Sequence, residues 1–519
     1  MTLGSRPALG LDGMVATGHP LATVAGLEVL AAGGNAVAAA LAAAAATWVT
    51  LPMMCGPGGD AFALVWDPKQ RDPIGFGGGG TAPAAATADW FLERGHRLVP
   101  LQGPLSVGVP GGVAVMSEMA ERLGSKGFDE LFAFAVRLAR DGFPISARLA
   151  RYFEEYADDY GRRAPAPGEL FPQPELAGSI EKIARGAGAL YRGELAETIS
   201  RHVQELGGLL SAEDFAAERP DVYAPPAVDY HGWRVYQTAP PSQGFVVLEE
   251  LAIVEGFDLS DPLAAEAVHL MVEAKKLAVA DRNRYAGDPR QVTWDLNRLI
   301  SHEHAAELRA SIDPARAVTA GQPAAAGDTT YLCVADRDGM LVSFVHSLSL
   351  AFGSGIQVPG TGIWLNDRAG RGFTLADGHP NRIAPGKRTM STLNAYLVAR
   401  NGEGRFAGGT PGGDGQVQWN LQVLAGLLDA GRDPQAAAEA PRWTHGPTTD
   451  PWRLDSSETL VLEEGFGEDV AGELRRRGHP ARLDQETAGR GSVQVVERTE
   501  EGILRGGSDP RGGGLAAGR

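Results

Sequence analysis

Two adjacent hydroxyl residues, Thr329 and Thr330, open a run of apolar and β-branched residues that predicts a strand. Residues 321–327 (GQPAAAG), just before them, are uncharged and mostly small. A cut between Asp328 and Thr329 would place a free α-amine beside the Thr329 hydroxyl. Because the pKa of such an amine is about 7.7–8, it can take the hydroxyl proton near neutral pH. Thr329 is therefore a candidate nucleophile, although threonine also simply favours strands.

A glycine-rich turn at residues 408–414 (GGTPGGD) is a second candidate. It lies between a predicted strand at 405–407 and a predicted apolar helix at 419–428. Gly412 and Gly413 would present backbone N–H groups at the start of that helix, where a developing oxyanion can bind. The alternative is an ordinary helix-initiating turn without a ligand.

Ser347 and Ser349 lie on another predicted strand, just before Phe352-Gly-Ser-Gly355. Side chains two residues apart share one face of a strand. Both hydroxyls could therefore hydrogen-bond to the hydroxyl or the amine of Thr329.

Three other motifs carry less weight. Residues 75–80 have the GxGxxG spacing of a dinucleotide loop, but they lead into Thr81-Ala-Pro83 and not into a helix. His302 and His304 are two residues apart, so on a helix they would point in different directions, and we interpret them as surface histidines. The GxSxG turn of the α/β-hydrolases is absent from the sequence.

The surrounding elements predict a mixed α/β chain. Strands are expected at 14–16, 61–66, 331–335, 341–346, 395–399 and 492–496, and helices at 20–32, from 35 onward, and from about 262 to 285. Strands 331–335 and 341–346 would form a β-hairpin around the turn at 336–339. Residues 115–220 are expected to be rich in helix, and the glycine-rich residues 506–519 to be loose.

Composition limits the function. A net charge of −17 over 519 residues argues against nucleic acid or an anionic membrane as partner. The two cysteines cannot build a disulfide framework, which favours a reducing compartment. The N-terminus lacks a signal-peptide pattern, and the longest apolar run, 36–51, is mostly Ala and shorter than the roughly 20 residues of a membrane span. We expect a cytoplasmic protein in which this run is a buried helix.

Several short stretches resemble the γ-glutamyltranspeptidase family of N-terminal-nucleophile hydrolases in order and spacing, over nearly the whole chain. They are residues 33–37 (GGNAV), 56–60 (GPGGD), 108–111 (GVPG), 240–244 (PPSQG), 327–330 (GDTT), 352–355 (FGSG), 385–388 (PGKR) and 411–413 (PGG). The resemblance implies a four-layer αββα fold and self-cleavage before Thr329 into segments 1–328 and 329–519. These segments would form a heterodimer that is one structural domain, and a dimer of such heterodimers is an open alternative.

The resemblance also implies an acyl-Thr329 ester intermediate, a small-molecule amide substrate and no cofactor. By position in the family's motifs, Gly412 and Gly413 would form the oxyanion hole. Ser347 takes the place of a supporting threonine and Ser349 that of an asparagine near the substrate. A third pair, Ser391 and Thr392, falls on two serines that hold the α-carboxylate of the acyl donor.

Three departures from the family pattern concern the acyl donor. An arginine expected just before Ala82-Pro83 is replaced by glycines at 77–80. An acidic residue expected near Gly372, for the donor's amine, has no clear equivalent, because Asp367 comes too early; Arg368 introduces a cation in the same run. An arginine suits a carboxylate that has no neighbouring ammonium group.

The sequence therefore predicts an amidohydrolase or acyltransferase whose acyl donor is of the oxamate or glutaryl type, with Arg368 binding the donor. One alternative is an ordinary γ-glutamyl hydrolase or transferase that acts on glutathione. Another is an uncleaved binding protein without catalysis. For Arg368 itself, the alternative is a structural ion pair.

Overall fold

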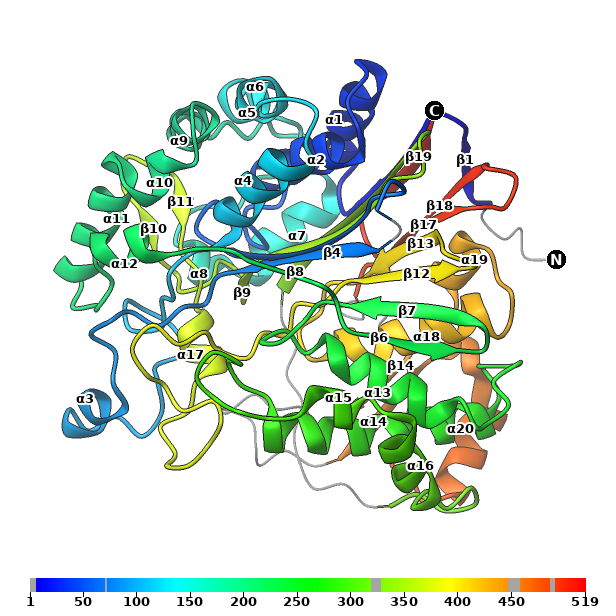
Figure 1. Ribbon diagram of the computed structural model, residues 1–519. Coiled ribbons are helices and arrows are strands. Elements are labelled where there is room, and N and C mark those ends of the chain that lie inside the picture. Colours follow the sequence, from blue (N-terminus) through cyan, green and yellow to red (C-terminus); the bar gives the residue numbers. More distant parts are fainter. Residues whose placement is uncertain (1–5, 71, 319–327, 447–457, 486–490) are drawn as a thin grey trace.

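The computed structural model describes residues 6–70, 72–318, 328–446, 458–485 and 491–519. They form four layers, with two β-sheets face to face in the middle and helices on both outer sides (Figure 1). The predicted αββα arrangement is confirmed.

The sheet that contains Thr329, called the Thr329 sheet below, has seven antiparallel strands. In spatial order they are β19 (Leu515–Gly518), β2 (Gly13–Thr17), β8 (Asp328–Asp336), β9 (Leu341–Ser349), β3 (Asp60–Trp66), β4 (Pro73–Gly78) and β5 (Asp221–Tyr223). Strands β8 and β9 form the predicted hairpin near the centre of the sheet. Thr329 therefore lies at the beginning of a buried inner strand.

The second sheet is also antiparallel and has seven strands. Its order is β1 (Ala8–Gly10), β18 (Leu504–Ser508), β17 (Gln494–Arg498), β13 (Glu403–Gly409), β12 (Tyr396–Arg400), β7 (Trp233–Gln237) and β6 (Ala227–Tyr230). Each sheet takes strands from both sides of the peptide bond between Asp328 and Thr329. The segments 1–328 and 329–519 are thus interleaved in both sheets.

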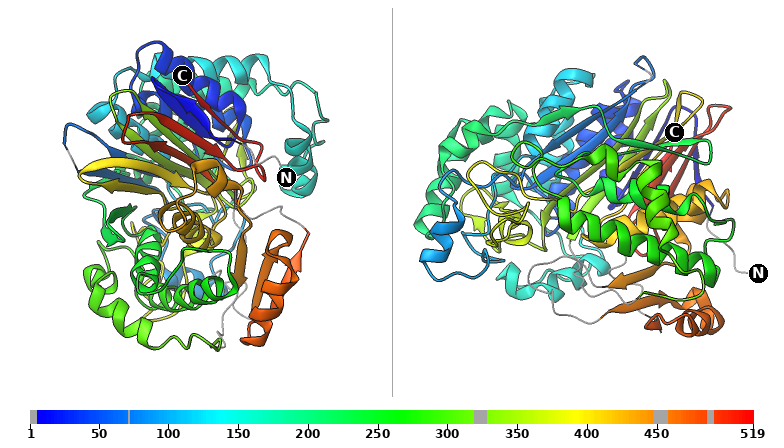
Figure 2. Two further views of the ribbon diagram at one scale, coloured as in Figure 1. Left: turned by 90° about the vertical axis from the view of Figure 1, so that its right-hand side faces the viewer. Right: turned by 60° about the horizontal axis from the view of Figure 1, so that its bottom comes forward.

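Helices from the first half of the chain cover the outer face of the Thr329 sheet (Figures 1 and 2). The elements on this side are α1 (Pro20–Ala31), α2 (Ala36–Thr50), α4 (Gly112–Leu123), α5 (Phe128–Leu131), α6 (Ala133–Asp141), α9 (Pro174–Ala184), α10 (Gly188–Tyr191), α11 (Glu194–Glu205) and α12 (Ala212–Ala217). Two further helices, α7 (Ala147–Glu155) and α8 (Ala157–Tyr160), lie apart from them (Figure 2). This layer agrees with the prediction that residues 115–220 are rich in helix.

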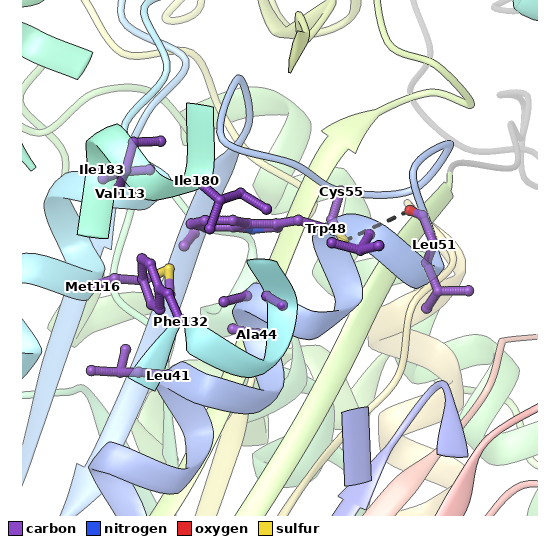
Figure 3. Packing of buried hydrophobic residues seen from close by; sticks show 14 of the residues in the cluster. Leu41, Ala44, Trp48, Leu51, Cys55, Val113, Met116, Phe132, Ile180 and Ile183 are labelled. Atoms are coloured by element: carbon purple, nitrogen blue, oxygen red, sulfur yellow. Dashed lines mark hydrogen bonds between the residues drawn. The ribbon is translucent and has the colours of Figure 1, made fainter. Parts of the chain in front are cut away.

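Helix α2 is the alanine-rich run predicted to be a buried helix. The Asn35 side chain caps it by accepting a hydrogen bond from the Ala38 N–H, and every residue of the helix is buried. Alanine lets neighbouring helices approach closely, and the bulk is supplied by residues such as Trp48, whose ring packs edge-on against Phe132 (Figure 3). In the described part of the chain, no helix is both long and apolar enough to cross a membrane.

A second helical layer covers the outer face of the second sheet (Figures 1 and 2). It contains α13 (Gly244–Val254), α14 (Ala265–Tyr285), α15 (Leu296–Leu299), α16 (His302–Ala310), α18 (Gly415–Leu428) and α19 (Pro434–Glu439). A small sheet of β14 (Trp443–Gly446), β15 (Thr459–Glu463) and β16 (Ala481–Asp484) carries α20 (Gly467–Arg476) at the periphery. The long predicted helix near residues 262–285 is α14.

Apolar side chains fill the space between the two sheets. Members of this inner core are Phe62, Leu64, Tyr331, Val345, Leu397 and Ala407. Both faces of both central sheets are therefore buried, which fixes the register of β8 and β9 and with it the position of Thr329.

The expectation that residues 506–519 are loose was wrong. Glycines in this stretch form parts of β18 and β19, where they allow close packing rather than mobility. A Cβ at Gly507 would lie 2.3 Å from the carbonyl oxygen of Pro434, and one at Gly506 would lie 2.5 Å from the sulfur of Met14. Glycine content here reflects a lack of space between neighbouring elements.

Candidate active site

Thr329 lies at an irregular point in the pairing of β8 with β9. Asp328 pairs with Ser349, whereas Thr330 pairs with His346, so the register shifts at Thr329. Such a bulge turns a side chain away from the regular alternation of the strand. The Thr329 side chain is buried, with 2% of its surface exposed.

A chain of hydrogen bonds starts at the Thr329 hydroxyl. Thr329 Oγ1 donates to Ser347 Oγ at 3.1 Å, and the N–H of Ser349 donates to the same Ser347 oxygen at 2.7 Å. Ser349 has φ of +91°, in the left-handed region that favours glycine, so the alternation predicted for the two serines ends at this residue. Its hydroxyl is buried and has no hydrogen-bond partner among the described residues.

The two predicted oxyanion glycines form a tight turn before α18. Gly412 has φ of +127° and Gly413 has φ of +55°. A Cβ at Gly412 would lie 2.0 Å from Cζ3 of Trp419, so no other residue fits there. Within the described ranges, no acceptor is found for the N–H group of either glycine. Both groups are therefore available to an oxygen of a ligand.

Two residues that the sequence analysis did not single out hold this turn. Arg282 of α14 donates from Nη1 to Asp414 Oδ1 at 2.7 Å, and both side chains are buried. Gln243 precedes α13 and donates from Nε2 to the carbonyl oxygens of Gly413, at 3.2 Å, and Thr392, at 2.8 Å. Arg282 also donates to Gln243 Oε1. The only sequence signal was that Gln243 belongs to the PPSQG stretch.

Ser391 and Thr392 lie close to this turn through Gln243. The N–H of Gln243 donates to the carbonyl oxygen of Ser391 at 2.8 Å, and Ser391 Oγ accepts from the N–H of Leu393 at 3.3 Å. Thr392 Oγ1 is buried and has no hydrogen-bond partner in the described structure. The Thr392 hydroxyl is therefore available to a ligand as donor and acceptor, while the Ser391 hydroxyl is described only as an acceptor.

Arg368 takes part in a buried ion pair. Its Nε donates to Asp60 Oδ2 at 2.9 Å, and both side chains are 2% exposed. Asp60 Oδ1 accepts from the N–H of Gly80 at 3.0 Å. Burial raises the pKa of Asp60 to about 6, although Arg368 opposes this rise. One guanidinium nitrogen, Nη2 of Arg368, has no hydrogen-bond partner among the described residues.

A second arginine in the same run, Arg371, was missed. Both arginines lie in the short helix α17 (Arg368–Gly372). Arg371 Nη1 donates to the carbonyl oxygen of Ser349 at 3.2 Å, while its buried Nη2 has no partner in the described ranges. Nearby, Asp367 accepts from the N–H of Leu350 through Oδ1 at 3.0 Å, and its Oδ2 is without a described partner. Burial raises the pKa of Asp367.

A cavity of about 570 Å³ opens in front of Thr329. Its walls are mostly apolar and come from Gly18, His19, Pro20, Leu21, Leu51, Met54, Pro144, Ser146, Arg148, Leu149, Tyr152, Thr329, Thr330, Tyr331, Pro411, Gly412, Gly491, Ser492, Pro510, Gly512 and Gly513. Thr329 and Gly412 thus face the same space. Arg148, on α7, brings a cation to this wall, and its Nη2 donates to the hydroxyl of Tyr152 at 2.8 Å.

The histidines interpreted as surface residues differ from each other. The His302 side chain is exposed, with 68% of its surface accessible, as expected. His304 is 9% exposed, and its Nε2 lies 2.6 Å from Asp281 Oδ2. The prediction was wrong for His304 because α16 packs this side against α13 and α14, while His302 faces solvent.

Hydrogen bonds thus join predicted site residues within two separate groups. Thr329, Ser347 and Ser349 are joined directly by hydrogen bonds. Gly413 and Thr392 are joined through Gln243. Asp328 begins β8, and its side chain lies outside the described parts of the structure.

Comparison with known proteins identifies relatives along the whole chain. A glutathione hydrolase-like YwrD proenzyme of Bacillus subtilis (strain 168) is 36% identical, covering 99% of this chain and 100% of the relative. An oxamate amidohydrolase proenzyme of Klebsiella pneumoniae subsp. pneumoniae is 34% identical, covering 98% of each. The crystal structure of a cephalosporin acylase from Bacillus halodurans has a TM-score of 0.92 at 35% identity, covering 100% of this chain and 98% of that one.

These relatives are named as hydrolases, acylases and proenzymes, and the prediction of an amide-cleaving or acyl-transferring enzyme with an N-terminal nucleophile is confirmed. The family model described as gamma-glutamyltranspeptidase matches residues 22–519. The chain belongs to the gamma-glutamyltranspeptidase family.

Proposed function

We propose that this enzyme cuts itself between Asp328 and Thr329 and then cleaves amides whose acyl part carries a carboxylate, of the oxamate or glutaryl type. The observation that carries the acyl specificity is a pair of buried guanidinium groups, Arg368 and Arg371, each with an unpartnered Nη2 among the described residues. Arg371 is hydrogen-bonded to Ser349, which belongs to the same hydrogen-bond chain as Thr329.

Self-cleavage uses the groups already described. Thr329 Oγ1 attacks the carbonyl carbon of Asp328, and the amide is replaced by an ester. Water then hydrolyses this ester, which leaves a carboxyl terminus on Asp328 and a free α-amine on Thr329. Ser347, as the acceptor from Thr329 Oγ1, orients the attacking oxygen.

In the mature enzyme, the α-amine of Thr329 takes the proton from Oγ1, which attacks the amide carbonyl carbon of the substrate. The N–H groups of Gly412 and Gly413 donate to the resulting oxyanion. The leaving amine receives the proton, and the acyl group stays on Thr329 as an ester. Water, or an acceptor amine, attacks this ester in the same way and restores the Thr329 hydroxyl. No step requires a cofactor.

The two arginines favour a carboxylate on the acyl group. A buried N–H group without an acceptor costs free energy, and the oxygens of a carboxylate would supply acceptors with matching geometry. The Thr392 hydroxyl, which has no partner in the described structure, would provide a further donor, as predicted for Ser391 and Thr392. We assign the acyl part of the substrate to this side of Thr329.

We assign the cavity lined by Thr329 and Gly412 to the leaving amine. Its volume of about 570 Å³ is much more than ammonia requires. Apolar walls with Arg148 at the rim suit a bulky amine that bears an acidic group. Between the two acyl types, this cavity favours N-substituted glutaryl-type amides over a simple amide such as oxamate.

A γ-glutamyl donor, as in glutathione, is the second candidate, and one observation favours it. Asp367 Oδ2 is buried without a described partner close to Ser349, where it could accept from the donor's ammonium group. We rank it second because burial raises the pKa of Asp367 and so disfavours the anion that an ammonium group needs.

Denaturing electrophoresis with N-terminal sequencing tests the self-cleavage. We expect two fragments with Thr329 at the new N-terminus, and a single 54.5 kDa band for Thr329→Ala. Thr329→Ser, which keeps a hydroxyl, should still be cut. A single band for the unaltered protein would favour the uncleaved binding protein instead.

Steady-state kinetics on paired anilides tests the acyl part. We expect kcat/KM for glutaryl-anilide to exceed that for γ-glutamyl-anilide by at least tenfold, since the two differ only in the α-amine. Equal values would refute the assignment of the arginines. Comparison of glutaryl-anilide with unsubstituted glutaramic acid measures the contribution of the leaving-group cavity.

The proposed mature enzyme is a cytoplasmic heterodimer of segments 1–328 and 329–519. Its net charge of −17 supports a small-molecule substrate rather than nucleic acid or an anionic membrane. Sedimentation of the processed enzyme would distinguish this heterodimer from a dimer of heterodimers.

A further inference from the structure

Three helices behind the second sheet bring Glu249, Asp281 and His304 together. They belong to α13, α14 and α16 respectively, and their ligand atoms all lie within 4.8 Å of one another. His304 Nε2 is 2.6 Å from Asp281 Oδ2 and 3.6 Å from Glu249 Oε1. We call this group the three-helix cluster.

Glu249 is the unusual member of the three-helix cluster. Its side chain is 0% exposed, and neither carboxylate oxygen has a hydrogen-bond partner in the described structure. Asp281 brings a second carboxyl group to the cluster, and Glu250 is a further buried acid next to it. A buried carboxylate is costly unless its charge is compensated, so the cluster must hold a proton, on Glu249 or on His304, or bind a cation.

We propose that the three-helix cluster is a structural site for a divalent transition-metal cation, with Zn²⁺ as the representative ion. Two carboxylates and one imidazole are a common donor set for such ions, and water can complete the coordination. The site does not depend on the proposed reaction at Thr329.

The distances are compatible with this coordination. Ligand bonds of about 2.1 Å in a tetrahedral site place neighbouring ligand atoms about 3.4 Å apart. The edge between His304 and Glu249, 3.6 Å, already has this length. The edge between His304 and Asp281, 2.6 Å, must open by about 0.8 Å, which a side-chain rotation can provide because 17% of the Asp281 side chain is exposed.

A second group with metal-binding residue types provides a contrast. His269, Glu273 and His479 also lie within 4.8 Å of one another. Here, however, Lys276 Nζ is 2.8 Å from Glu273 Oε1, so a cation already neutralises the carboxylate. His269 Nδ1 and His479 Nε2 are 2.8 Å apart and satisfy each other. This second cluster does not need a metal ion and serves as an internal control.

The position of the three-helix cluster indicates what the ion would do. Helix α16 is the last described helix before Thr329, so it lies near the end of the segment that self-cleavage would release as the first chain. Asp281 is adjacent to Arg282, which holds the turn of Gly412, Gly413 and Asp414 (the oxyanion turn). Helix α13 begins next to Gln243, which holds the same turn. A metal ion would therefore fasten the end of this segment to the helices that support the turn.

Metal titration of the purified enzyme tests the proposal. After treatment with a chelator, the enzyme should bind about one Zn²⁺ per 54.5 kDa unit by calorimetry, and its Tm should rise on addition of Zn²⁺. Glu249→Gln and His304→Gln should abolish both effects, whereas His479→Gln, in the second cluster, should retain them.

Two outcomes would overturn the proposal. The first is the absence of stoichiometric Zn²⁺ binding to the unaltered enzyme. The second is equal binding by the unaltered enzyme and Glu249→Gln. Either would support the competing state, in which burial and the neighbouring Asp281 raise the pKa of Glu249 to about 10 and the carboxyl group keeps its proton. If both cluster variants fail to fold, anomalous diffraction from crystals of the unaltered enzyme soaked in Zn²⁺ decides between the two.

Discussion

In the proposed mechanism, the environment of Thr329 directs a weakly nucleophilic hydroxyl at a carbonyl carbon. An extra residue in β9 interrupts the regular pairing opposite Thr329, and the hydrogen bond to Ser347 then fixes the direction of Oγ1. Ser347 is itself held by the N–H of Ser349. Orientation of the nucleophile thus depends on two residues from the neighbouring strand.

Loss of the Ser347 hydroxyl should impair catalysis without unfolding the protein. We expect Ser347→Ala to lower kcat by about fivefold, since one hydrogen bond contributes about 1 kcal/mol, and to slow self-cleavage as well. Ser347→Thr retains the hydroxyl and should recover most of the rate. Burst kinetics with glutaryl-anilide measures the acylation step directly; an unchanged acylation rate in Ser347→Ala would contradict the positioning role.

The two arginines should respond differently to substitution. Arg368→Ala leaves Asp60 buried without its partner, so we expect the free energy of unfolding to fall by about 3–5 kcal/mol. Arg371→Met removes a group whose Nη2 has no partner in the described ranges, so we expect a smaller loss of stability. Because this variant also loses a donor to the substrate carboxylate, we expect its KM for glutaryl-anilide to rise at least tenfold. Urea unfolding and initial rates separate the two effects.

A matched substrate provides the control for this comparison. Butyryl-anilide lacks the terminal carboxylate, and its KM should be similar in the unaltered enzyme and in Arg371→Met. A KM that rises equally for both substrates would show that Arg371 acts only on the shape of the site.

At the scale of elements, the short-range patterns were sufficient to predict much of the structure. Two strand-like runs on either side of the turn at 336–339 predicted the hairpin of β8 and β9, and Asn35 with its alanine-rich continuation predicted α2. The ends were less accurate: α18 begins at Gly415, four residues before the predicted start at 419. Glycines misled the prediction at 506–519, because the sequence alone cannot distinguish a flexible glycine from one that fits against a neighbouring backbone.

Long-range pairing accounts for what was missed in the site. Arg282 and Gln243 act on Gly413 and Asp414 from far away in the sequence; no local motif marks Arg282, and the PPSQG stretch that contains Gln243 does not indicate its partner. Arg368, on α17, was noticed as a departure from the family, but its partner Asp60 begins β3, 308 residues earlier in the sequence. His304 was assigned to the surface because the packing of α16 could not be derived from its own residues.

The oxyanion turn offers a test at this scale. A Cβ in Gly412→Ala would collide with Trp419 and would require an unfavourable φ of +127°. We expect kcat to fall by about 10²–10³, because the N–H groups would no longer point at the carbonyl oxygen of the substrate.

Gly402→Ala is the matched control. This residue, in the turn between β12 and β13, has φ of +75°, and a Cβ at this position would extend into open space. It places an alanine at positive φ, without a steric clash and far from the oxyanion turn, so kcat should be unchanged. Equal loss in both variants would mean that strain alone, and not the oxyanion hole, lowers the rate.

At the scale of the whole molecule, the interleaved topology connects self-cleavage with stability. The Thr329 sheet contains β8, β9 and β19 from the later segment and β2, β3, β4 and β5 from the earlier one. The second sheet is mixed in the same way (Figure 1). A cut between Asp328 and Thr329 breaks one covalent bond and leaves this hydrogen bonding and the core between the sheets in place.

The two chains should therefore remain together after cleavage. Because neither segment retains a complete sheet by itself, we expect the processed enzyme to elute as one species in native size-exclusion chromatography and to unfold in a single cooperative transition. Native mass spectrometry should give a mass close to 54.5 kDa or a multiple of it, and denaturation should release the two fragments. Thr329→Ala, which stays uncut, provides the covalent reference for elution and unfolding. Separation of the fragments under native conditions would contradict the view that residues 1–328 and 329–519 form one structural unit.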